Sequence, residues 1–110
     1  MVRLIASVFA LGVSVALSAT AQDRVANGEK VFADQKCTVC HSIVGKGNVK
    51  GPLDEVGSKL SADEIRAWIT DAKTMTEKTG ATRKPPMKMF TLPKDDVDAL
   101  VAYLQTKKKT

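Results

Sequence analysis

Cysteine and histidine are scarce in this chain of 110 residues, which contains two cysteines and one histidine. A zinc site needs four ligands, so a carboxylate would have to complete any site built on these three side chains. A disulfide between Cys37 and Cys40 would close a very small, strained loop. A thioredoxin-like dithiol would require a βαβ pattern nearby, and the chain shows no clear strand. These three interpretations are therefore the weaker ones.

The three residues form one compact motif, C-T-V-C-H at residues 37–41. The spacing C-x-x-C-H is the attachment signal for c-type haem. On one helical turn, positions i, i+3 and i+4 share a face, so Cys37, Cys40 and His41 point to the same side. The two sulfurs can bond to the two vinyl groups of a haem, and the imidazole can ligate its iron. The motif predicts one covalently bound haem c, attached through Cys37 and Cys40 and ligated by His41.

Large aromatic side chains are also few. Residues 22–110 contain four of them: Phe32, Trp68, Phe90 and Tyr103. So short a chain makes a weak core on its own, and a buried haem would supply the missing apolar volume. Trp68 either packs in the core or lines the haem pocket, where its N–H could reach a propionate or a carbonyl.

The apolar run Leu4–Leu17 is shorter than the roughly 20 residues that a membrane-spanning helix needs. Arg3 precedes this run, and Ser18-Ala19-Thr20-Ala21 follows it as an A-x-A cleavage site. The pattern predicts a signal peptide at residues 1–21 that is cleaved, one domain at residues 22–110, and a periplasmic location. Export fits haem attachment, which takes place outside the cytoplasm. The alternative is an uncleaved leader that remains as a membrane anchor.

The formal net charge is +5, and the lysines are scattered along the chain. No arginine-rich stripe with interleaved aromatics is present, so nucleic-acid binding is not expected. A basic surface serves either solubility or the docking of an acidic protein partner.

Helical periodicity predicts a first helix from about Asp23 to Lys36. Gly28 and Phe32 share one face of it, and glycine inside a helix costs about 1 kcal/mol relative to alanine. A glycine at this position makes sense if a second helix approaches closely, so Gly28 and Phe32 are predicted to form one contact patch.

A second helix is predicted to begin at Ser61, because Ser61-x-x-Glu64 is a capping box. It should fray after Met75 into a polar loop at residues 76–80. A last helix is predicted from about Pro93 to Lys107, with a buried stripe at helical spacing formed by Val97, Leu100, Val101 and Leu104. The pattern as a whole predicts an all-α fold of three or four helices.

Two proline-bearing loops connect these helices. Pro52 lies eleven residues past His41, near enough for its carbonyl to accept the imidazole N–H and orient the ring. Pro85 and Pro86 make residues 83–90 an extended, stiff segment, which we call the strap. A stiff strap can hold a thioether at one spot.

These motifs together resemble those of small bacterial class I cytochromes c, and the resemblance covers all of residues 22–110. The C-T-V-C-H element, the helix with Gly28 and Phe32, and the loop Gly51-Pro52-x-x-x-x-Gly57 are similar to their counterparts in that family. Pro86-Met87 and the final L-V-A-Y-L segment at residues 100–104 are also similar.

The resemblance implies a cytochrome c fold whose first and last helices cross near Gly28 and Tyr103. It also implies His41 and a methionine as iron ligands. Met87 is the predicted ligand, because it follows the prolines directly and precedes Tyr103 by the family's usual spacing. Met89 is the alternative, since the family often has Met-Pro where this chain has Pro-Met-Lys.

The function that the resemblance implies is one-electron transfer between redox protein partners by a monomer that is not an enzyme. Lys88, beside the predicted ligand, is the lysine most suited to steer an acidic partner. Contact with a membrane is expected only through the partners or an uncleaved leader. The alternative is a haem enzyme or gas sensor with an open distal site.

Overall fold

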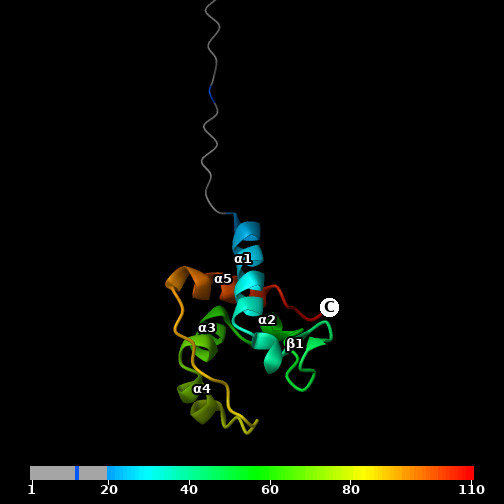
Figure 1. The fold of residues 1–110 in the computed structure, drawn as a ribbon, viewed down its shortest axis with the longest axis vertical. Helices are drawn as coiled ribbons and strands as arrows, with labels where there is room; N and C mark the ends of the chain where they lie inside the picture. Colours follow the sequence, from blue (N-terminus) through cyan, green and yellow to red (C-terminus); the bar gives the residue numbers. More distant parts are fainter. Residues whose placement is uncertain (1–11, 13–19) are drawn as a thin grey trace, which may run out of the picture.

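The computed structural model of this protein describes Gly12 and residues 20–110. The predicted leader lies outside the described residues except for Gly12, Thr20 and Ala21, so its cleavage stays a prediction. Among the described residues, no helix is both long enough and apolar enough to cross a membrane. The elements are α1 (Ala21–Asp34), a 3-10 helix η1 (Cys37–Val39), β1 (Ser42–Ile43), β2 (Lys46–Gly47), α2 (Val56–Lys59), α3 (Ala62–Thr70), α4 (Ala72–Thr79) and α5 (Lys94–Gln105) (Figure 1).

The all-α prediction is confirmed, since the sheet is one antiparallel pair of two-residue strands, β1 and β2. The described part holds five α-helices rather than three or four. The predicted second helix ends at Thr70 because Asp71 has φ −146° and ψ 52°, outside the helical region. The predicted loop after Met75 is also wrong, because α4 continues to Thr79. Ala72 and Met75 are buried, and packing of this face stabilises a helix whose other residues are polar.

The first helix begins and ends two residues earlier than predicted. Thr20 caps it: its hydroxyl accepts a hydrogen bond from the Asp23 N–H at 3.2 Å, and the Asp23 carboxylate accepts one from the Thr20 N–H at 3.3 Å. This reciprocal capping box satisfies two otherwise unpaired N–H groups. At the other end, Lys36 is left-handed (φ 57°), and this turn directs the chain from α1 into η1.

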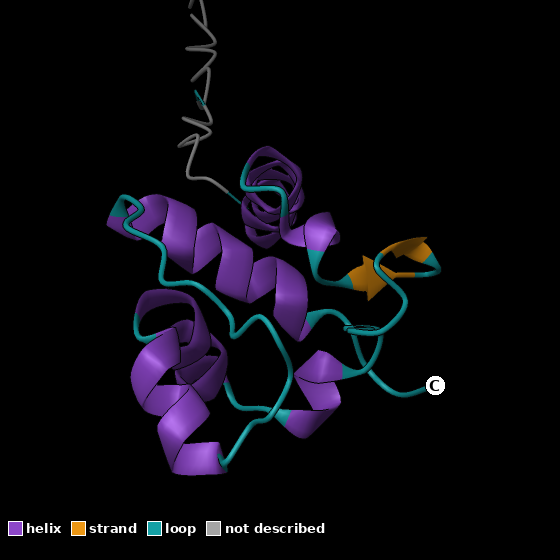
Figure 2. Ribbon diagram, turned by 60° about the horizontal axis from the view of Figure 1, so that its bottom comes forward, coloured by secondary structure: helices purple, strands orange, loops and turns teal. Residues whose placement is uncertain are grey.

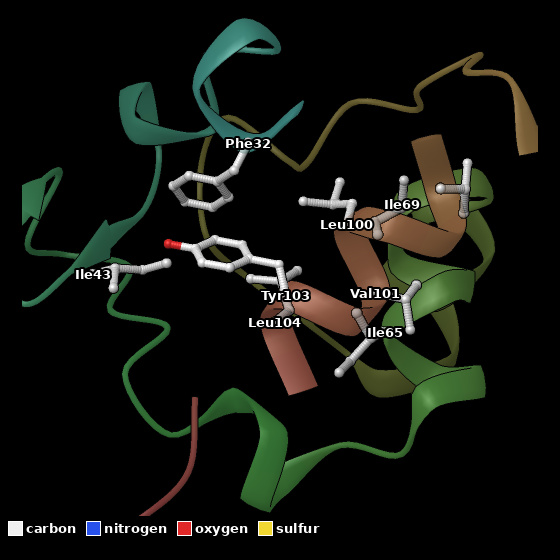
Figure 3. Close-up of a cluster of buried hydrophobic side chains, with 9 residues drawn as sticks. Phe32, Ile43, Ile65, Ile69, Leu100, Val101, Tyr103 and Leu104 are labelled. Atoms are coloured by element: carbon white, nitrogen blue, oxygen red, sulfur yellow. The ribbon is translucent and has the colours of Figure 1, made fainter. Parts of the chain in front are cut away.

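The close crossing of α1 and α5 is the central contact of the fold (Figures 1 and 2). A Cβ added to Gly28 would overlap the backbone carbonyl of Ala99 and would lie 2.5 Å from the Cβ of Tyr103. One turn further along α1, the rings of Phe32 and Tyr103 meet edge to face, with centroids 5.7 Å apart (Figure 3). The crossing near Gly28 and Tyr103 is therefore confirmed.

The buried core lies between α1, α3 and α5. Ile65 and Ile69 of α3 face the buried stripe of α5 (Figure 3). The carboxylate of Asp98 on α5 pairs with Arg66 of α3 at 2.7 Å. The strap is joined to this core at Phe90, whose N–H donates to the carbonyl of Ile69 at 3.1 Å. The members of the buried core are Phe32, Ile43, Ile65, Ile69, Val97, Leu100, Val101, Tyr103 and Leu104.

Substitution of Gly28 by valine is expected to lower the free energy of unfolding by about 1–3 kcal/mol, because the new side chain would force α1 away from α5. Denaturant unfolding followed by circular dichroism measures the change. Asn27→Val is the control, since Asn27 is exposed on the same helix and tests the effect of a β-branched residue alone. Equal midpoints for both variants would contradict the close crossing.

Candidate haem site

The motif at residues 37–41 forms a tight turn directly after α1. The N–H of Cys40 donates to the carbonyl of Cys37 at 3.2 Å, and the N–H of His41 donates to the same carbonyl at 2.9 Å. The first bond is of the 3-10 type and the second of the α type. Cys37, Cys40 and His41 therefore lie on one turn, as the spacing predicts. All three are partly buried, and both cysteines are free thiols.

The His41 ring is oriented by the backbone of the following loop. Its Nδ1 lies 3.0 Å from the carbonyl oxygen of Gly51. A carbonyl can only accept, so Nδ1 carries the proton and Nε2 keeps its lone pair for a metal. In this arrangement the ring has the tautomer and the fixed direction that an iron ligand requires.

The acceptor is thus Gly51, which corrects the prediction that the Pro52 carbonyl would bind the imidazole. The reason is the register of a parallel bridge between Ser42 and Pro52. The N–H of Ser42 donates to Gly51 at 3.1 Å, and the N–H of Leu53 donates to Ser42 at 2.8 Å. Successive carbonyls of an extended segment point to opposite sides, so the Gly51 oxygen faces residues 41–42 and the Pro52 oxygen faces away. Pro52 is exposed, and its place in a haem pocket stays a prediction.

Asn48 connects the hairpin β1–β2 to the motif at residues 37–41 through hydrogen bonds. Its N–H lies 3.0 Å from the Thr38 carbonyl and 3.1 Å from the His41 carbonyl, and its side-chain amide donates to the Val39 carbonyl at 3.2 Å. The carbonyls of Thr38, Val39 and His41 are thereby satisfied without the cysteine or histidine side chains. These side chains remain available for another group.

Burial dominates the electrostatics of the turn. It raises the pKa of the Cys37 thiol to about 11, so this thiol is protonated at neutral pH. A protonated thiol is a poor nucleophile, so a dithiol that contains it is poorly suited to redox exchange. Burial also lowers the pKa of His41; the hydrogen bond to Gly51 acts against this, and the charge of Arg83 adds to it. Both trends favour neutral side chains, which suits an apolar pocket.

The predicted methionines differ in burial. Met87 is partly buried on the strap, whereas Met89 is 58% exposed. Met75, predicted at a frayed helix end, is instead buried within α4. The backbone bond from Phe90 to Ile69 holds the end of the strap against α3, three residues after Met87. Met87 therefore stays the predicted ligand and Met89 the alternative.

Several side chains outside the buried cluster have apolar surface that a flat apolar group would cover. Trp68 is half-buried on α3 but is absent from the buried cluster and from the side chains packed against it, which disfavours a simple core role. Several apolar side chains at the edge of the core also keep part of their surface exposed, among them Leu53, Leu60, Phe90 and Leu92. A bound haem would cover such surface and gain the corresponding transfer free energy.

Other chemistry at the turn is less well supported. In the part of the chain that the structure describes, no three His, Cys, Asp or Glu side chains converge as a metal site would require. The strands of that part are a single short hairpin, without the βαβ unit of a thioredoxin-like dithiol.

Two residues near the turn were missed from the sequence: Gly51 as the acceptor for His41, and Arg83 as the cation beside Gly51. The Gly51-Pro52 pair was a signal for the loop but could not decide which carbonyl faces His41. Arg83 gave no signal, because its position depends on how the strap returns to the turn.

Sequence comparisons relate this chain to known proteins. Cytochrome c oxidase subunit 2 of Alkalihalophilus pseudofirmus is 24% identical over 106 residues, which cover 88% of this chain and 30% of that protein. The chain therefore spans less than a third of that relative's length. No solved structure matches the chain. The cytochrome c family model matches residues 25–108. Because this match covers more than half of the chain, the protein belongs to the cytochrome c family as a class I c-type cytochrome, a haem-iron protein of electron transfer.

Proposed function

We propose that this chain is a one-electron carrier that holds a single haem c through Cys37 and Cys40, with His41 and Met87 as axial ligands. The observation that carries the proposal is the turn at residues 37–41. It presents two free thiols and an imidazole whose Nδ1 is hydrogen-bonded to the carbonyl of Gly51. When bound, a haem supplies the one-electron couple of ferrous and ferric iron.

Cys37 and Cys40 would each form one thioether. In such an addition the sulfur bonds to one carbon of a vinyl group and the thiol hydrogen moves to the other carbon, so the step needs no oxidant. Both cysteines enter this step as free thiols.

His41 would bind iron through Nε2 while its Nδ1–H donates to Gly51. This bond fixes the ring and increases the basicity of the ligand. Met87 would complete the coordination, and His/Met ligation raises the reduction potential. Two filled axial positions leave no position for a substrate, which is the physical argument for a carrier rather than an enzyme.

Carbon monoxide distinguishes this carrier from a haem enzyme or gas sensor with an open distal site. We expect the absorption spectrum of the reduced protein to remain unchanged when the gas is added, because Met87 occupies the position that it would need. A rapid spectral change would support the rival function and contradict the proposal.

We further propose that the leader at residues 1–21 is cleaved on export and that the domain acts in the periplasm. Mass spectrometry of protein expressed with haem-attachment machinery tests the cleavage of the leader and the covalent attachment of haem at once. The expected mass corresponds to residues 22–110 plus one haem. A mass that retains the first 21 residues would contradict cleavage, and a mass without haem would contradict the function.

The redox partners are proposed to present an acidic face to the basic surface of this chain, which carries a formal net charge of +5. The similarity to a subunit named as part of cytochrome c oxidase makes a terminal oxidase the first acceptor to test. Lys88 is exposed on the strap, with its Nζ 5.0 Å from the centroid of the Phe90 ring. Lys88 directly follows the proposed ligand Met87 along the strap.

Lys88→Glu is expected to slow electron transfer with the partner about tenfold at low ionic strength, because the substitution reverses the charge at the docking face. High salt should reduce the difference. Stopped-flow measurements over a salt series test this. Lys108→Glu is the control, since it makes the same change of net charge on the exposed C-terminal tail. Rates that do not respond to salt would leave the basic surface with a role in solubility alone.

A further inference from the structure

The guanidinium of Arg83 occupies the space that a side chain at residue 51 would fill. A Cβ added to Gly51 would overlap Nη1 of Arg83 and the carbonyl of Cys40, and would lie 3.0 Å from Cζ of Arg83. The absence of a side chain at Gly51 therefore lets the strap bring a cation against the backbone of the loop. This contact joins segments that are far apart in the chain.

Gly51 is also the residue whose carbonyl accepts the hydrogen bond from Nδ1 of His41. Gly51 thus accepts a hydrogen bond from the imidazole of His41 through its carbonyl and has the guanidinium of Arg83 beside its Cα. Arg83 is the charged side chain whose electrostatic effect reaches the His41 ring. Because Arg83 contacts Gly51, its charge lies closer to the proposed iron ligand His41 than a charge elsewhere on the surface would.

The charge of Arg83 is not neutralised by a neighbouring acid. The ion pairs within the described part of the chain join other residues, and none includes Arg83. A hollow of about 400 Å³ beside Cys40 is lined by Arg83, Lys50 and Lys84 and by no carboxylate. The field at this edge of the site is therefore positive.

We propose that Arg83 is a positioning residue that raises the reduction potential of the iron through Gly51 and His41. This inference rests on the proposed function. Ferric iron carries one more positive charge than ferrous iron, so a fixed cation nearby disfavours the oxidised state. The cation also draws electron density from the Gly51 peptide, which weakens its carbonyl as an acceptor and makes the His41 ligand less basic. A less basic ligand stabilises ferric iron less, so both effects raise the potential.

The test is a redox titration of the haem-loaded full chain, with soluble mediators, on three variants. Arg83→Gln removes the charge, Arg83→Lys keeps it, and Lys84→Gln removes the adjacent charge that lines the same hollow. At a fixed applied potential, Arg83→Gln should lower the ratio of ferrous to ferric protein about threefold. This change equals about 28 mV, since a tenfold change corresponds to 59 mV for one electron.

Arg83→Lys should retain most of the wild-type potential, and Lys84→Gln should shift it by clearly less than Arg83→Gln. Because Arg83 is exposed, the shift should shrink as the salt concentration rises. Equal shifts in Arg83→Gln and Lys84→Gln, or no shift in either, would overturn the assignment.

The titration separates this assignment from the proposed function. Each variant is first compared with wild type for haem content by mass and for the absorption band of sulfur-bound ferric haem. Wild-type protein without covalent haem would overturn the proposed function and the role of Arg83 together. Haem-loaded protein whose potential does not respond selectively to Arg83 would overturn the role of Arg83 alone.

Discussion

Replacement of Cys37 and Cys40 by alanine is expected to yield a chain without haem and without a cooperative fold. The buried cluster has nine members, of which only Phe32 and Tyr103 are aromatic. A chain of this size buries a smaller fraction of its surface on folding than a larger domain does, so a bound group contributes much of its stability. Far-ultraviolet circular dichroism should show loss of most of the helical signal, and thermal scans should show no sharp transition.

The control for this result is Val39→Ala. Val39 lies between the two cysteines and is 67% exposed, so its truncation changes the motif without removing a thiol or a core contact. It should bind haem and unfold cooperatively. A helical double variant with a sharp thermal transition would contradict the dependence of the fold on haem.

The elements that could be predicted are those with strong local signals. The last helix was expected from Pro93 to Lys107 and extends from Lys94 to Gln105, because a complete buried stripe marks it. The second helix begins where its capping box predicts, at Ser61. Local patterns of this kind act within one or two turns and need no knowledge of the tertiary structure.

Other elements depend on contacts that the sequence does not display. Helix α4 has few apolar residues, and the loop predicted at residues 76–80 falls on its second half, yet Ala72 and Met75 are buried. Asp71 interrupts the helical pattern without a proline or glycine to mark the break. The single turn of α2 is too short to show a period. Tertiary packing, rather than propensity, stabilises these helices.

The candidate site divides in the same way. Cys37, Cys40 and His41 are close in the sequence, so their shared turn followed from spacing alone. The acceptor at Gly51 and the cation at Arg83 come from segments that meet only in the fold. Their positions depend on the bridge at Ser42 and on the path of the strap, which no local pattern encodes.

Met87→Ala is expected to lower the reduction potential by a few tenths of a volt, within the span of about 0.8 V that axial ligands cover. Loss of the soft thioether removes the ligand that favours ferrous iron. The weak near-infrared band of sulfur-bound ferric haem should disappear, and carbon monoxide should then bind the reduced protein. Redox titration and absorption spectroscopy measure these changes.

Met89→Ala and Met75→Ala are the matched tests of this ligand assignment. Met89 is 58% exposed two residues further along the strap, so its truncation should preserve the near-infrared band and the potential. Met75 is 8% exposed within α4, so its truncation should cost about 2–5 kcal/mol of stability while the band persists. If the band survives Met87→Ala and disappears in Met89→Ala, Met89 is the ligand. The strap would then have to bring Met89 inward, although its backbone is tied to α3 one residue later, at Phe90.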